Sequence, residues 1–411
     1  MQKTVTSFPK EKIKVLLLEG VHPAAIKLFN NRGFKNIESI ERSVTEKELI
    51  AKIKDVHLIG IRSKTQLTDN VLQEAHKLLA AGAFCIGINQ IDLSTATEKG
   101  IAVFNSPFSN TRSVAELVIG NSIMLLRRVI EKNQAAHNGT WLKDSAECYE
   151  VRGKTLGIIG YGHIGSQVSV LAEAMGMKVL FYDVMPKLSL GNAQTAKSMD
   201  EIFKKSDVVS LHVPGTADTK NLINAARIKK MKRGAILINL SRGDVMDVMA
   251  VKEALLSKQL GGLAVDVFPA EPKSNKDKFI TPLQNIPNVI LTPHIGGSTL
   301  EAQEAIGLDV AEKLISFTDT GNSGGSLTVP DMSLPVQHHA HRVFHIHHNV
   351  PGVLSQINSI LSNMKVNIVG QFLKTNDKIG YVVLDIDKKS SPKVMEELKK
   401  VKETIRTRSL Y

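Results

Sequence analysis

Residues 154–165 read KTLGIIGYGHIG, and this stretch decides the fold of the central part of the chain. An apolar, strand-like run leads straight into a glycine-rich turn made by Gly160, Gly162 and Gly165. Such glycines permit a tight turn, let a pyrophosphate approach the backbone amides and allow close helix packing, and the following helix N-terminus attracts the anion. The next strand-like run ends at Asp183, whose carboxylate suits ribose hydroxyls and repels a 2′-phosphate. The stretch therefore predicts a dinucleotide-binding turn that prefers NAD to NADP.

Strand-like runs alternate with helical segments on both sides of this turn. Between about residues 12 and 110 the alternation predicts one parallel sheet, and Thr111–Ile130 reads as a long helix that connects it to the next. A complete doubly wound sheet needs about six strands. The second alternation supplies six strand-like runs: KTLGIIGYG, MKVLFYD, DVVSLHVP, GAILINLS, GLAVDVF and NVILTPH.

The last quarter of the chain has a different organisation. Residues 298–317 form an amphipathic helical pattern, and residues 320–335 combine Gly, Ser and Pro as linkers do. The rest follows the order βαββαβ, which is ferredoxin-like. We therefore expect an α/β protein in which a doubly wound Rossmann domain is inserted in a flavodoxin-like domain. The expected boundaries are 1–109 with 299–320 for the flavodoxin-like domain, 110–298 for the Rossmann domain, 321–337 for a linker and 338–411 for the ferredoxin-like domain.

Composition excludes several classes of protein. Of the 411 residues, 43% are hydrophobic and 22% are charged, so there is enough apolar material for several cores. Only two cysteines are present, which excludes a disulfide framework and favours a reducing, cytoplasmic setting. The N-terminal stretch has no long apolar run, so we expect neither export nor a membrane span. The net charge of +12 attracts anions, but the lysines are scattered, which favours an anionic metabolite over nucleic acid.

Polar side chains stand just past three strand ends of the central sheet. Arg242 follows LINLS, Glu271 follows LAVDVFPA, and His294 follows LTP. Because doubly wound folds bind ligands at the carboxyl ends of their strands, these side chains are expected to meet beside the nicotinamide. His294 is the candidate base for a hydroxyl proton, Glu271 would orient its ring, and Arg242 would grip a carboxylate in two hydrogen bonds. Taken singly, each could be an ordinary strand cap, loop acid or turn residue.

The motifs GYGHIG with Asp183, SRG with Arg242, PAEP after Asp266 and TPHIGGS around His294 resemble those of the D-isomer-specific 2-hydroxyacid dehydrogenases. The similarity covers nearly the whole chain and points to the members that end in an ACT domain. It implies that Arg242, Glu271 and His294 are catalytic and that NAD is the cofactor. The NAD contacts that it implies are Gly160, Gly162, His163, Ile164, Gly165, Asp183, Val213, Pro214, Leu240, Ser241, Arg242, Asp266, His294, Ile295, Gly296 and Gly297.

The resemblance also implies a substrate and a reaction. The expected activity is NAD-dependent oxidation of 3-phospho-D-glycerate to 3-phosphohydroxypyruvate, the first step toward L-serine, with reduction of 2-oxoglutarate to 2-hydroxyglutarate as a side activity. The substrate phosphate would be held by Arg62, Ser63 and Lys64 after the strand HLIGI, with Asn110 in the connector. Two rival functions stay open: a dehydrogenase of another D-2-hydroxy acid, and an NADH-sensing co-repressor that binds protein partners.

The resemblance further implies a homotetramer that is inhibited by serine. Trp141, the only tryptophan, lies in a polar stretch and is expected to pack on a partner subunit, and Lys143 beside it adds positive charge. Serine would bind the ACT domain through His347, Asn349 and Asn367, although QHHAHRV replaces the usual Gly-Gly hinge before it. Six histidines lie between residues 338 and 348, but with no carboxylate or cysteine beside them we expect no metal site.

Overall fold

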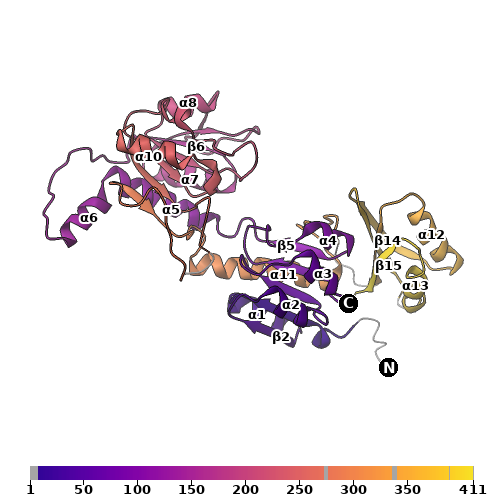
Figure 1. The fold of residues 1–411 in the computed structure, drawn as a ribbon. Coiled ribbons are helices and arrows are strands. Elements are labelled where there is room, and N and C mark those ends of the chain that lie inside the picture. The colour runs from indigo at the N-terminus through magenta and orange to yellow at the C-terminus, as the bar shows by residue number, and fades with distance from the viewer. Residues whose placement is uncertain (1–7, 273–275, 336–339, 388, 411) are drawn as a thin grey trace. The chain divides into compact units, whose positions relative to one another are not determined.

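The computed structural model describes residues 8–272, 276–335, 340–387 and 389–410 (Figure 1). The chain divides into two compact units, Met1–Ser109 with Gln303–Tyr411, and Asn110–Ala302. The first unit holds a parallel sheet near the N-terminus and a small antiparallel sheet near the C-terminus, and the second unit holds one larger parallel sheet. The expected fold class is confirmed.

The N-terminal sheet has five parallel strands in the order β2-β1-β3-β4-β5. This is the flavodoxin-like order, in which the chain reverses direction of travel between β1 and β3 and leaves a ligand-binding crevice at their carboxyl ends. The strands are β1 (Lys14–Leu18), β2 (Asn36–Ile40), β3 (Leu58–Ile61), β4 (Ala80–Ala83) and β5 (Ala102–Asn105).

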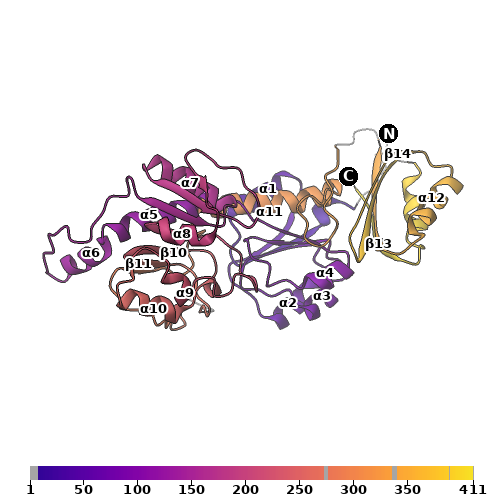
Figure 2. The same cartoon turned by 90° about the horizontal axis from the view of Figure 1, so that it is seen from above.

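Helices cover both faces of this sheet because its strands alternate two buried sets of apolar residues (Figure 2). Val15 and Leu17 of β1 share one core with α1 (Pro23–Asn31) and α11 (Leu300–Thr320). Leu16 and Leu18 point into the opposite core. That core is closed by α2 (Glu46–Ile53), α3 (Asp69–Glu74) and α4 (Leu93–Glu98).

Two details of this sheet differ from what the local sequence pattern indicates. The run AFCIGINQ reads as a strand, but β4 ends at Ala83 and Cys85–Gln90 form a loop. The β-strand β2 has only half-buried and exposed residues, so its sequence NIESI lacks the apolar signal of the central strands. Edge strands of this kind are stabilised by pairing with a neighbour, here β1, and not by a buried face.

The sheet of the second unit has seven parallel strands in the order β12-β11-β10-β9-β6-β7-β8. Its order reverses between β6 and β9, which places the crevice for a dinucleotide at their carboxyl ends. The strands are β6 (Thr155–Ile159), β7 (Lys178–Tyr182), β8 (Gln194–Thr195), β9 (Val208–Leu211), β10 (Ala235–Asn239), β11 (Leu260–Val265) and β12 (Val289–Leu291). Six of these strands were predicted. The seventh, β8, was missed because it consists of only two residues, both exposed.

Helices cover this sheet on both faces as well. One face packs against α5 (Thr111–Leu126) and α7 (His163–Ala174), and the other against α8 (Met199–Lys205), α9 (Ala225–Ile228) and α10 (Val248–Leu256). The predicted connecting helix is therefore part of the Rossmann core. It ends early because Arg128 adopts a left-handed φ of 51°, after which α6 (Val129–His137) begins.

Side-chain caps start most of the shorter helices. At each N-cap a short polar side chain accepts a hydrogen bond from the backbone N–H two or three residues later, which satisfies an otherwise unpaired donor. These caps are Thr45 for α2, Thr68 for α3, Asp92 for α4, Ser198 for α8, Asn224 for α9 and Asp247 for α10.

The C-terminal sheet has four antiparallel strands in the order β14-β15-β13-β16, which matches the predicted βαββαβ pattern. One of its faces packs on both helices of the module. The elements are β13 (His341–His348), α12 (Val353–Asn363), β14 (Ile368–Thr375), β15 (Ile379–Ile386), α13 (Ser391–Leu398) and β16 (Thr404–Ser409). Within the described ranges, no helix has the length and hydropathy needed to cross a membrane.

Candidate active site

The glycine turn between β6 and α7 has the geometry of a pyrophosphate cradle. Gly160 has a φ of 93°, and a Cβ there would lie 2.3 Å from the carbonyl oxygen of His212. A Cβ on Gly165 would lie 2.2 Å from the carbonyl oxygen of Gly160, so both positions require glycine for packing. At Gly162, by contrast, a Cβ would have no atom within 4 Å. The open side of the turn thus lies at the N-terminus of α7, where a pyrophosphate binds to backbone amides.

Asp183 stands directly after β7 with its carboxylate held in place. One oxygen accepts a hydrogen bond from the backbone N–H of Tyr161 at 2.7 Å, and the other accepts from Met185 N–H at 2.9 Å. Each oxygen keeps a lone pair for a further donor. The carboxylate is therefore oriented beside the glycine turn, where it can accept both hydroxyls of an adenine ribose. The residues present fit NAD.

The other predicted cofactor residues lie along the same carboxyl edge of the sheet. His163 and Ile164 open α7, Val213 and Pro214 follow β9, and Leu240 and Ser241 follow β10. The Ser241 hydroxyl donates to Asn239 Oδ1 at 2.8 Å, and the Asn239 amide donates to the carbonyl oxygen of Arg242 at 3.0 Å. Asn239 therefore shapes the turn that carries Arg242.

Asp266, predicted as a cofactor contact, also binds the segment that carries His294, which its position in the sequence does not indicate. Its carboxylate is buried, with 1% of the residue exposed, and accepts three hydrogen bonds from the segment after β12. One oxygen accepts from the Thr292 hydroxyl at 2.6 Å and from Ile295 N–H at 2.8 Å, and the other accepts from Gly296 N–H at 2.8 Å. Asp266 thereby holds the loop in which His294 has a left-handed φ of 55°. The structure thus identifies Asp266 as the anchor of the histidine loop.

His294 and Glu271 form a direct pair. The ring Nδ1 lies 2.9 Å from Glu271 Oε2 and 3.1 Å from Oε1, and Oε1 also accepts from Phe268 N–H at 3.1 Å. An ionised carboxylate can only accept hydrogen bonds, so Nδ1 carries a proton, and in the neutral form of the ring the lone pair is on Nε2. The His294 side chain is 53% exposed. The pair therefore presents a proton acceptor on an open side of the loop.

Arg242 follows β10, which neighbours β11, and β11 in turn neighbours β12. Its Nη1 donates to the carbonyl oxygen of Ser241 at 2.7 Å, and the residue as a whole is exposed. Gly243 next to it approaches the backbone of Phe268 so closely that a Cβ would lie 2.1 Å from the Phe268 carbonyl carbon. The turns that carry Arg242 and Glu271 are therefore packed together. The three predicted catalytic residues share one edge of one sheet.

The predicted phosphate residues divide between the two units. Arg62, Ser63 and Lys64 follow β3 in the first unit, at the β1/β3 crevice, and Ser63 and Lys64 are exposed. Asn110 belongs to the second unit, where its amide packs against Gly297 of the histidine loop. Sequence reasoning missed Glu19, which follows β1 and hydrogen-bonds to the Arg62 loop; its only local signal is an acid directly after a buried strand.

The predicted effector residues lie around β13 and β14. The rings of His345 and His347 stack with centroids 5.3 Å apart, so these two residues share one face of β13. Burial lowers the pKa of His345 to about 4. Asn349 lies beyond the last residue of β13 and donates to the carbonyl oxygen of Asn376 at 2.8 Å, and Asn367 is exposed before β14. His338 and His339 lie outside the described residues.

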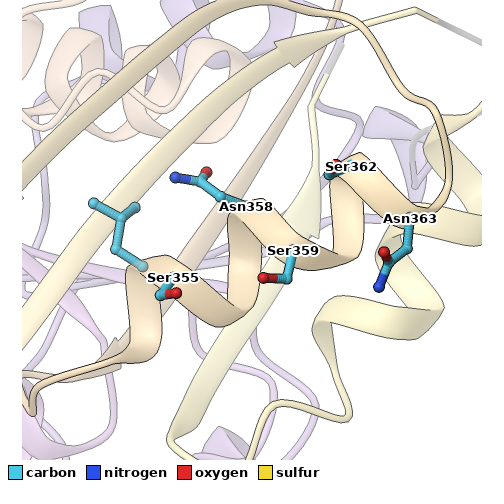
Figure 3. Close-up of a pocket in the computed structure, with 6 residues that line it drawn as sticks. Ser355, Asn358, Ser359, Ser362 and Asn363 are labelled. Carbon is cyan, nitrogen blue, oxygen red and sulfur yellow. The ribbon is translucent and has the colours of Figure 1, made fainter.

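A hollow of about 540 Å³ lies on the exposed side of α12, and five of its six lining side chains are short and polar (Figure 3). Neither the predicted effector residues nor the catalytic residues line it. Its lining residues are Leu354, Ser355, Asn358, Ser359, Ser362 and Asn363. In the described part of the chain, no three His, Cys, Asp or Glu side chains are grouped so as to hold a metal ion.

Comparison with known proteins matches both parts of this arrangement. Residues 119–296 match the family model of the D-isomer specific 2-hydroxyacid dehydrogenase NAD binding domain, and residues 344–406 match that of an AHAS small subunit-like ACT domain. The chain is 50% identical over 405 residues to the D-3-phosphoglycerate dehydrogenase of Haemophilus influenzae, which covers 98% of this chain and 99% of that protein. It is 48% identical over 424 residues to D-3-phosphoglycerate dehydrogenase 1 of Saccharomyces cerevisiae, covering 100% of this chain and 90% of that one.

Solved structures agree with the fold. D-lactate dehydrogenase from Aquifex aeolicus, complexed with NAD and lactic acid, superposes with a TM-score of 0.66 at 30% identity and covers 77% of this chain and 100% of its own. A D-2-hydroxyisocaproate dehydrogenase gives a TM-score of 0.70 at 26% identity, with the same coverage.

Proposed function

The chain belongs to the D-isomer-specific 2-hydroxyacid dehydrogenases, and we propose that it is the member that oxidises 3-phospho-D-glycerate to 3-phosphohydroxypyruvate with NAD. Relatives that share about half of its residues over nearly the full length carry the name of that activity. The observation that carries the proposal within the structure is the His294–Glu271 pair on the carboxyl edge of a dinucleotide-binding sheet. The product is the keto acid from which serine is made.

Each residue of the pair has a chemical task in this oxidation. NAD, when bound, supplies the acceptor for the hydride that leaves C2 of the substrate. His294 Nε2 accepts the proton of the C2 hydroxyl, and Glu271 on Nδ1 keeps the ring oriented and stabilises the imidazolium that forms. Arg242 offers a planar fork for the C1 carboxylate and polarises the developing carbonyl beside it.

A simple assay tests the activity. We expect NADH to be consumed when 3-phosphohydroxypyruvate is added, since the reverse reaction uses the same groups. An NADH-sensing co-repressor would bind NADH, as measured by fluorescence titration, without turning it over. Faster reduction of another 2-oxo acid, such as 2-oxoglutarate, would assign the main activity to a different D-2-hydroxy acid.

Arg62→Ala is expected to affect phosphorylated substrates selectively. A guanidinium forms charge-assisted hydrogen bonds to a phosphate, so its loss should raise the KM for 3-phosphohydroxypyruvate about 10- to 100-fold. The KM for hydroxypyruvate, which lacks the phosphate, should change less than about threefold. Steady-state kinetics with both substrates measure this. Arg42, an exposed residue paired with Glu48 in the same unit, provides the control variant Arg42→Ala. Equal effects on both substrates would contradict the phosphate role.

We also propose that L-serine inhibits the enzyme through the ACT domain. The support is the ACT-type module, whose sheet carries the predicted residues at its two ends. His347 and Asn349 lie at the end where His347 pairs with Gly380, and Asn367 lies at the opposite end, next to Ile368, which pairs with Ile386. Asn367→Ala is expected to raise the serine concentration for half-inhibition by about tenfold or more, because a lost hydrogen bond to a charged ligand costs about that factor. Asn363→Ala on α12 is the control. Inhibition that is equal in both variants and the unchanged protein would remove Asn367 from the site.

The quaternary structure that we propose is a homotetramer in which a partner subunit covers Trp141. Its side chain is 83% exposed and the adjacent Leu142 is 48% exposed, which is unusual for such large apolar groups unless a partner covers them.

Cys85 and Cys148 are both unpaired thiols, which supports a reducing cytoplasmic setting.

A further inference from the structure

Glu19 is a buried acid at the carboxyl edge of the N-terminal sheet. It follows β1 directly, and Arg62 follows β3, the neighbouring strand across the point where the strand order reverses. The residue is only 9% exposed and has a left-handed φ of 67°, a conformation that is uncommon outside glycine. Backbone strain of this kind persists only where surrounding contacts enforce it.

The carboxylate of Glu19 binds the backbone of the Arg62 loop. Oε1 accepts hydrogen bonds from Thr65 N–H at 2.7 Å and from Arg62 N–H at 3.2 Å, and Oε2 accepts from Lys64 N–H at 3.0 Å. The backbone oxygen of Glu19 also accepts from Arg62 Nη1 at 3.4 Å. One buried carboxylate therefore orients three of the four amides of residues 62–65, and the backbone oxygen of the same residue contacts one edge of the guanidinium.

Gln90 fixes the same loop from the other side. Its Nε2 donates to the carbonyl oxygen of Arg62 at 2.7 Å, and its backbone oxygen accepts from Leu67 N–H at 2.8 Å. The residue is 7% exposed, and it comes from the loop that follows β4. Arg62 is thus held at its N–H by Glu19 and at its C=O by Gln90, two residues that lie far apart in the sequence.

This arrangement determines which groups can meet a bound anion. Because the amides of Arg62, Lys64 and Thr65 point at Glu19, they are not free to cradle a phosphate as a glycine-rich nest would. Recognition is left to the side chains, of which Ser63 and Lys64 are exposed and Arg62 is partly so. Side chains recognise an anion well only if their backbone is held in the right geometry before binding.

We propose that Glu19 is a positioning residue for the substrate phosphate: its buried carboxylate holds residues 62–65 in the conformation that directs the side chains of Arg62, Ser63 and Lys64 toward the anion. The inference rests on the proposed function, since it assumes that this loop binds the phosphate. The proposal also explains why a carboxylate can lie beside a site for an anion. Three backbone N–H groups donate to the carboxylate of Glu19 and stabilise its negative charge, so the carboxylate faces the protein backbone.

The test uses Glu19→Gln in the full-length enzyme. The amide keeps the size of the side chain, but it replaces one acceptor oxygen by a donor that faces the loop amides. We expect the KM for 3-phosphohydroxypyruvate to rise about tenfold, with kcat changing less than about twofold. The KM for hydroxypyruvate and for NADH should stay within about twofold of the unchanged enzyme. Glu41→Gln is the matched control, because Glu41 is an exposed carboxylate on the same edge, near Gly20.

The outcomes separate the inference from the proposed function. If Arg62→Ala raises the KM for the phosphorylated substrate and Glu19→Gln does not, the loop binds phosphate and the role of Glu19 is refuted. If Arg62→Ala has no selective effect, the proposed phosphate site itself fails. If Glu19→Gln raises the KM for both substrates equally, or lowers only kcat, the role of Glu19 is purely structural.

Gln90→Met provides a second route should Glu19→Gln not fold. Methionine preserves the volume of the buried side chain but removes the donor to the Arg62 carbonyl oxygen. The same selective rise in KM is expected, about three- to tenfold, since the loop loses one of its two anchors. An unchanged KM for 3-phosphohydroxypyruvate in a folded Gln90→Met enzyme, verified by circular dichroism, would overturn the proposal that this loop must be held in advance.

Discussion

Replacing His294 by asparagine is expected to lower kcat by about 10²- to 10⁴-fold, the usual contribution of a positioned general base. Asparagine is preferred to alanine because His294 has a φ of 55°, which asparagine tolerates with little strain. Its amide can also donate to Glu271, so the loop should keep its geometry. What the variant lacks is a group that can accept the C2 hydroxyl proton. Stopped-flow or steady-state kinetics at saturating substrate measure the loss.

Binding of the cofactor should survive this change. The pyrophosphate turn at Gly162 and the carboxylate of Asp183 come from other strands, so the Kd of NADH, measured by fluorescence, should shift less than about threefold. His137→Asn, on the exposed surface of α6, is the control and should have normal kcat. Turnover within threefold of the unchanged enzyme in His294→Asn would show that another group takes the proton.

Arg242→Lys is expected to lower kcat/KM for 3-phosphohydroxypyruvate by about 10²- to 10³-fold, or ~3–4 kcal/mol of transition-state stabilisation. A lysine keeps the charge but has no planar fork, so it cannot hold both oxygens of a carboxylate and polarise the adjacent carbonyl at once. Asn239 binds the backbone oxygen of Arg242 and not its side chain, so the turn should keep its conformation in the variant. A fall in kcat/KM would then report the lost side-chain contact. Steady-state kinetics at low substrate concentration give the ratio directly.

The same strand provides the control for this prediction. Arg233 precedes β10 and is exposed, whereas Arg242 follows it, so the two arginines lie at opposite ends of one strand. Arg233→Lys should leave kcat/KM unchanged within about twofold. An equal, small effect of both substitutions would mean that Arg242 contacts solvent and not the substrate carboxylate.

Much of the fold follows from local patterns. Buried parallel strands are short apolar runs, and such runs predicted the central strands of both parallel sheets. Local patterns also predicted the glycine turn after β6 and the βαββαβ order of the last module. The edge strands β2 and β8 and the end of β4 could not be predicted in this way. The residues of β2 are half-buried or exposed, β8 has only two residues, and β4 is followed by an equally apolar loop, so only pairing with a neighbouring strand defines these elements.

The candidate site divides in the same way. Sequence alone determined which residues stand at the carboxyl ends of the strands, because side chains placed just after a parallel strand must reach one edge of the sheet, and His294, Glu271 and Arg242 were identified on that ground. Only the tertiary structure decided that Asp266 anchors the histidine loop and that Glu19 holds the Arg62 loop. The physical reason is that these carboxylates act through hydrogen bonds to backbone amides some 29 to 46 residues away, and a backbone amide looks the same at every position of a sequence.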